Sequence, residues 1–149
     1  LPSGLGGISW LQCWLPSGRM MYYPAARTVV GAYGPSIQVM SWKNKRWIPQ
    51  ILSRQVTVEN VIQAICRDMM ENDKEKIIKS GMCDVVLTVY DEIVAEFDED
   101  FATRMVGEGK KAKSAAVEWM ETEMSTPLEW FPLMPRASEG WVGTEFKKA

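Results

Sequence analysis

The chain has 149 residues, of which 46% are hydrophobic and 24% are charged, a composition typical of a globular protein with a core of its own. It contains no histidine, which excludes Ser-His and Cys-His catalysis and most zinc chemistry. The net charge of −2 gives no overall basic signature for nucleic acid. Any nucleic-acid binding must therefore come from a local patch.

Targeting signals are missing from the sequence as it stands. No apolar run approaches the roughly 18 residues of a membrane span, and the first residues lack the basic flank and apolar block of a signal peptide. Cys13, Cys66 and Cys83 are odd in number and lack metal-ligand spacing, which favours a reduced, cytoplasmic setting. Without a long apolar run, no membrane partner is expected. Because the chain does not begin with Met, it reads as a piece of something longer.

Residues 1–50 are predicted to be rich in short strands. Residues 10–14 and 19–23 flank a Pro and Gly turn and read as a hairpin. Residues 27–30 and 36–42 are further strand candidates. Residues 43–46 form a basic turn beside Trp42 and Trp47, which either grips a phosphate backbone or is simply solvated.

Residues 57–79 are predicted to form a long helix. Apolar residues recur there at helical spacing and make a stripe: Val58, Val61, Ile62, Ile65 and Met69. Thr57 is a plausible N-cap, and Gly81 suits the C-terminal stop. Cys66, beside the stripe, reads as a small core residue.

Residues 85–97 carry the most informative pattern of the chain. Two runs rich in β-branched and apolar residues flank Asp91-Glu92, which reads as a hairpin with a two-residue turn. Acidic residues do not suit a turn that needs positive φ. Where a residue type conflicts with the local structure inside an otherwise clear pattern, a functional site is indicated. Two carboxylates at a hairpin tip predict a binding site for a divalent cation. The alternative without a function is a solvated acidic turn.

The remaining residues are predicted to contain a helical turn at 101–106, a loop at 107–111 and a helix at 112–124. The aromatic tail from Leu128 is expected to dock on the core. The order of strands, long helix, hairpin and helix favours an α+β fold.

Four blocks, in order, resemble the C-terminal part of a family A (polymerase-I-like) DNA polymerase of the phage and prophage type. The blocks are residues 15–19 with Tyr22-Tyr23-Pro24, residues 58–68, residues 87–94 and residues 139–148. The resemblance covers nearly the whole chain. It implies an α+β fragment with a palm-type β-hairpin packed on the long helix, divided into a β-rich segment (1–50), the helix and acidic hairpin (57–97) and a helix with a docked tail (98–149).

The resemblance also implies roles for particular residues. Asp91 matches the metal-binding aspartate of the family's third palm motif, and Glu92 matches the acid beside it. Gln63 matches the glutamine that reaches the minor groove near the primer terminus. Arg54 lies close to the position of a DNA-contacting arginine of the family. Tyr90 replaces the family's histidine, which puts the primer-end contact in doubt but leaves the metal site in place.

The polar residues of the long helix indicate DNA binding independently of the resemblance. Asn60, Gln63 and Arg67 recur at i, i+3 and i+7 and are predicted to line a polar face opposite the apolar stripe. Minor-groove edges show similar acceptors for different base pairs, so amide or guanidinium donors there can check shape without choosing a sequence. An ordinary solvated helix face is the alternative.

The family's first palm motif, with its second metal-binding aspartate, and its nucleotide-binding fingers helix are not in this sequence. The expected function is therefore the C-terminal part of a DNA-directed DNA polymerase that acts on primer-template DNA and dNTP in a bacterial host cell. Mg²⁺ would be shared with a carboxylate of a missing N-terminal segment, and the chain alone is expected to be inactive. The alternatives are a non-catalytic nucleic-acid-binding module or prophage remnant, and a Mg²⁺-dependent nuclease.

Overall fold

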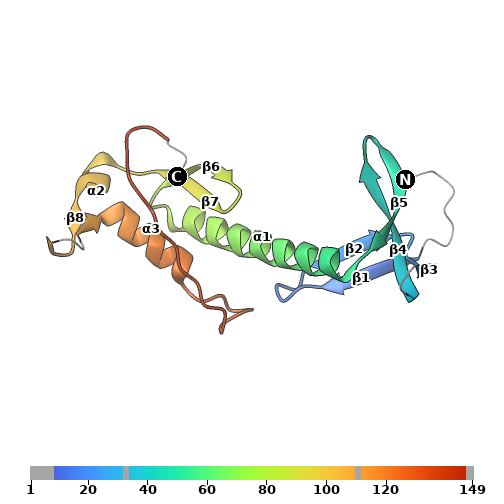
Figure 1. Cartoon of the computed structure of the whole chain (residues 1–149). Helices are drawn as coiled ribbons and strands as arrows, with labels where there is room; N and C mark the ends of the chain where they lie inside the picture. The colour runs from blue at the N-terminus through green and yellow to red at the C-terminus, as the bar shows by residue number, and fades with distance from the viewer. Residues whose placement is uncertain (1–8, 32–33, 110–111, 147–149) are drawn as a thin grey trace. The chain divides into compact units, whose positions relative to one another are not determined.

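A computed structural model describes residues 9–31, 34–109 and 112–146, and these form an α+β protein of small antiparallel sheets and helices (Figure 1). The first elements are β1 (Trp10–Trp14), β2 (Met20–Pro24), β3 (Arg27–Gly31), β4 (Gly34–Lys43), β5 (Arg46–Leu52) and α1 (Arg54–Ser80). The later elements are β6 (Asp84–Val89), β7 (Glu92–Glu96), α2 (Glu99–Thr103), β8 (Met105–Val106), β9 (Lys113–Ser114) and α3 (Ala115–Ser125). The chain divides within α1 into two compact units, Leu1–Ile65 and Cys66–Ala149.

The predicted N-terminal hairpin is confirmed. β1 and β2 pair antiparallel, with Trp14 opposite Met20. The turn between them closes through the Gly18 amide, which donates to the Leu15 carbonyl at 2.9 Å, and Gly18 takes a φ of +83° that suits glycine. Leu15 is buried, so the turn also supplies part of the small core of the first unit.

A three-stranded antiparallel sheet in the order β3-β4-β5 follows. The sequence predicted β3 and β4 but missed β5, which contains Pro49. Proline lacks the amide that a central strand needs. Since β5 is an edge strand, Pro49 is compatible with it. Val39 of β4 is the buried side chain of this sheet.

The long helix begins three residues earlier than predicted, and its cap differs. The Val56 amide donates to Ser53 Oγ at 3.2 Å, so Ser53 caps α1. Thr57 lies inside the helix, where its hydroxyl donates to the Ser53 carbonyl at 2.9 Å. The predicted stop at Gly81 is confirmed, with a φ of +66°.

The predicted apolar stripe of α1 is wrong in part. Val58 and Ile62 are more than half exposed, and Cys66 is exposed rather than part of a core. Ala64 and Ile77 are buried instead, each in its own unit. Helical spacing shows which residues share a face, but the partner elements decide which face is covered.

Phe97, which follows β7, connects α2 and α3 in the second unit. Its ring packs edge-on against Trp119 of α3 and stacks on Phe101 of α2, with both centroid distances at 5.8 Å. The predicted helical turn at 101–106 is instead α2 followed by β8, and the helix predicted from residue 112 begins at Ala115. Ser114 caps α3 by accepting from the Ala116 amide at 3.2 Å. The predicted loop residues Lys110 and Lys111 lie outside the described residues.

The tail docks, but not through the aromatic residues nearest its end. Leu128 is 3% exposed and the Arg136 side chain 5% exposed. Trp141 and Phe146 are about half exposed, so these two aromatic side chains contribute little to the docking. Lys147 and Lys148, the last residues of the fourth resemblance block, are outside the described part of the chain. Within the described residues, no helix is long and apolar enough to cross a membrane.

Candidate functional site

The acidic hairpin exists, with its turn one residue earlier than predicted. β6 and β7 pair so that Val89 lies opposite Glu92, which makes Tyr90-Asp91 the two-residue turn. Asp91 therefore sits at the tip, as predicted, whereas Glu92 begins β7. A bulge at Val86, between the pairs Val85–Ala95 and Leu87–Val94, shifts the register by one residue within the hairpin.

Tyr90 meets the positive-φ requirement of this turn. Its φ is +53°, which is uncommon for a bulky aromatic residue, and the residue is 87% exposed. The sequence placed this conformational conflict on Asp91-Glu92, but the structure places it on Tyr90. A strained residue beside the candidate metal ligand fits the tendency of such outliers to occur at functional sites.

The two carboxylates are accessible to an ion. Asp91 is exposed and Glu92 is half-buried, and neither carboxylate takes part in an ion pair or side-chain hydrogen bond with other described residues. They are hard oxygen donors of the kind that Mg²⁺ prefers. The described residues contain no group of three His, Cys, Asp or Glu side chains arranged to hold a metal. Two carboxylates fill only part of an octahedral shell, so the chemistry fits an ion shared with other ligands.

The candidate DNA-binding residues of α1 differ in their surroundings. Arg54, the first residue of the helix, and Gln63 are exposed. Arg67 pairs with Glu71 one turn later at 2.5 Å, and its side chain is 62% exposed. Gln63 belongs to the first unit and Asp91 to the second.

Asn60 lies on the packed side of α1 and not on a solvated polar face. Its Nδ2 donates to the Tyr23 hydroxyl of β2 at 3.3 Å. One turn later, Arg19 Nη2 donates to the Ala64 carbonyl at 3.1 Å. Asn60 therefore helps to fasten the N-terminal hairpin to the helix, which leaves Gln63 as the exposed amide of the predicted trio.

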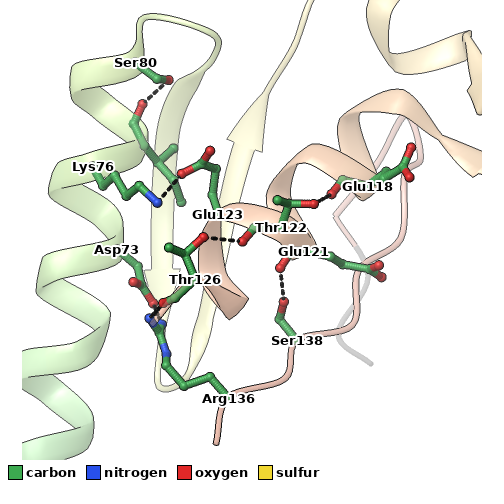
Figure 2. A network of polar contacts seen from close by, with 11 residues as sticks. Asp73, Lys76, Ser80, Glu118, Glu121, Thr122, Glu123, Thr126, Arg136 and Ser138 are labelled. Atoms are coloured by element: carbon green, nitrogen blue, oxygen red, sulfur yellow. Dashed lines mark hydrogen bonds and ion pairs between the residues drawn. The ribbon is translucent and has the colours of Figure 1, made fainter. Parts of the chain in front are cut away.

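The sequence missed a polar network that holds the tail in the second unit (Figure 2). Arg136 forms a buried ion pair with Asp73 of α1 and also donates to the Thr126 carbonyl at 2.5 Å. Lys76 pairs with Glu123 of α3 at 2.6 Å. Burial raises the pKa of Asp73 even though the Arg136 guanidinium opposes that shift.

A sequence signal for Asp73 existed. Ile65, Met69, Asp73 and Ile77 follow one another at intervals of four, so a carboxylate stands in line with apolar side chains. A buried charge needs a partner, and that requirement would have predicted a distant Lys or Arg.

Glu121 of α3 is a second attachment point for the tail. One carboxylate oxygen accepts from the Gly140 amide at 3.0 Å, and the other pairs with Lys113 at 2.5 Å. The hydrogen bond from Lys113 is the main reason that the pKa of Glu121 lies below its usual value. The network explains how a segment without regular structure is ordered.

Comparisons with protein-family models, with curated proteins and with solved structures found no match for this chain.

Proposed function

We propose that this chain is the C-terminal part of a family A DNA polymerase and that it contributes Asp91 to the metal site of template-directed deoxynucleotide addition. The observation that carries the proposal is the place of Asp91 in the two-residue turn of a β-hairpin, with its carboxylate exposed. A ligand held on paired strands is positioned more precisely than one on a long loop. The order of the four resemblance blocks supports the same assignment.

The proposed roles of the residues follow from their chemistry. Asp91, with Glu92 beside it, would hold Mg²⁺ together with a carboxylate from a segment that is not in this sequence. The ion, when bound, supplies charge stabilisation to the attacking and leaving oxygens of phosphoryl transfer. Gln63 would donate to minor-groove acceptors near the primer end, since its side chain is exposed on α1.

Reconstitution tests the proposal. Addition of a segment that carries the first palm motif and the nucleotide-binding helix is expected to restore extension of a primed template, whereas the chain alone has negligible activity. In the reconstituted enzyme, Asp91→Asn is expected to lower the extension rate by at least about a hundredfold, because several kcal/mol of charge stabilisation are lost.

Asp84→Asn is the matched control. Asp84 is another exposed aspartate of the same hairpin, at its open end opposite Glu96. This variant is expected to keep the rate of the unmodified protein. Full activity of the Asp91→Asn enzyme would show that the metal assignment is wrong.

A further inference from the structure

The charge of the chain is divided unequally between its two units. Residues 1–65 contain six Lys and Arg and a single acid, Glu59, whereas residues 66–149 contain 11 Lys and Arg and 18 Asp and Glu. The overall charge of −2 therefore conceals a basic unit of +5 and an acidic unit of −7. Such asymmetry between halves points to an anionic partner for the basic half.

The basic unit presents two tryptophans at the tip of the β4–β5 hairpin. Trp42 and Trp47 lie directly opposite each other in the strand pairing, so both side chains are on one face of the hairpin. Their ring centroids are 5.5 Å apart with an interplanar angle of 62°, and they are 57% and 37% exposed. A cross-strand aromatic pair stabilises a hairpin, but that role does not require the rings to remain open to solvent.

Three cations lie at the same tip, within the six residues 42–47. Lys43 lies opposite Arg46 in the next pair of the ladder, so these two side chains leave the hairpin on the face opposite to the tryptophans, and Lys45 occupies the turn at the apex. All three residues are exposed, and none pairs with a carboxylate of the described residues. The hairpin tip thus combines unneutralised positive charge with exposed indole rings.

The residues of the β4–β5 turn are not those that would make the turn most stable. Asn44 and Lys45 both have positive φ, +51° and +60°, as a tight two-residue hairpin turn of this hand requires. Asn suits the first position, but the second position normally takes glycine. A lysine held there costs local strain and places a cation at the apex.

We propose that the β4–β5 tip, residues 42–47, is a binding platform for single-stranded DNA. The cations would contact consecutive phosphates while an unpaired base stacks on the exposed face of Trp42 or Trp47. Duplex DNA offers the phosphates but keeps its bases stacked on one another, so the indole rings would gain nothing from it. The preference for DNA over RNA rests on the proposed function, whereas the tip geometry does not depend on it.

Binding can be measured on the full chain without Mg²⁺, separately from any polymerase activity. Titration with a dT oligonucleotide is expected to quench the tryptophan fluorescence. Three phosphate contacts on a single strand should give a slope of log affinity against log salt of about −2. The same titration with an rU oligonucleotide and with a duplex of equal length is expected to show weaker binding.

The variant Lys45→Gly separates binding from folding. Glycine fits the positive φ of residue 45, so the thermal midpoint should hold or rise while the salt slope becomes less steep by about 0.7. Trp42→Ala is expected to weaken dT binding by at least about fivefold through lost stacking. Trp14→Ala, which removes another exposed tryptophan of the same unit, should leave binding unchanged.

Several results would overturn the inference. These are unchanged dT affinity in Lys45→Gly, equal loss in Trp14→Ala and Trp42→Ala, equal or tighter binding of duplex or rU, or no binding of dT at low salt. Salt-dependent self-association that disappears in Lys45→Gly, without DNA binding, would assign the tip to the acidic unit of a second copy. A polymerase that fails to reconstitute while dT binding persists would reject the proposed function and keep the tip as a DNA-binding site.

Discussion

Asp73 and Arg136 show how much one pair of residues contributes to the second unit. Their side chains are 3% and 5% exposed, and they join α1 to a tail segment 63 residues later in the chain. Removal of one partner leaves a buried charge without compensation, which typically costs about 3–5 kcal/mol. We expect Arg136→Met to lower the free energy of unfolding at pH 7 by about that amount, measured by urea denaturation.

The pH dependence of this loss follows from the Asp73 carboxyl. Burial raises its pKa above the ordinary value. Between the pKa of the unfolded state and that of the native state, the native state therefore binds more protons than the unfolded state. Its contribution to stability is therefore fully present at acid pH and declines as the pH rises through the native pKa. Without the guanidinium the pKa rises further, so the loss in Arg136→Met should shrink between pH 7 and about pH 4.

An exposed ion pair of the same helix provides the comparison. Lys79 pairs with Glu75 at 2.6 Å, and both side chains are largely exposed. Lys79→Met is expected to leave the unfolding midpoint almost unchanged at either pH. Equal effects of the two substitutions on the free energy of unfolding would show that Arg136 does not compensate a buried charge on Asp73.

At the level of elements, the β6–β7 hairpin contains a removable strain. Tyr90 has a φ of +53° in the turn, where glycine avoids the contact between Cβ and the backbone. We expect Tyr90→Gly to raise the free energy of unfolding by about 1 kcal/mol, measured by urea denaturation. Thr88→Gly, at an ordinary strand position of β6, should instead lower it by a similar amount.

The predicted and the missed elements show which structural features a local sequence pattern can predict. The N-terminal hairpin and the acidic hairpin were predictable because alternation and turn residues act between neighbours in sequence. The register of the acidic hairpin was not, because Val89 pairs with Glu92 and makes Tyr90-Asp91 the turn, and the bulge at Val86 then shifts the pairing again toward the open end. β5 was missed because Pro49 is compatible only with an edge strand, and edge position depends on the whole sheet.

At the level of the whole molecule, the two units differ in how much apolar surface they bury. The buried hydrophobic side chains of the described first unit are Leu15, Val39 and Ala64. The second unit buries Ile77, Leu128 and three consecutive residues of α3, and it adds the Asp73–Arg136 pair.

This difference predicts unequal protection of backbone amides. Amides of β1 to β5 are expected to exchange with solvent faster than those of α3 and of the C-terminal half of α1, because fewer buried contacts must open. Hydrogen exchange followed by mass spectrometry measures this directly. Uniform protection along the chain would contradict the assignment of a weaker core to the first unit.

The sequence by itself determined the N-terminal hairpin, the acidic hairpin, the long helix and the presence of Asp91 at a tip, since these depend on periodicity and turn chemistry over a few residues. Only the tertiary structure decided that Asn60 packs against Tyr23, that Val58 and Ile62 stay exposed, and that Asp73 is buried with Arg136. The physical reason is that burial and pairing depend on segments tens of residues apart, which local patterns do not specify.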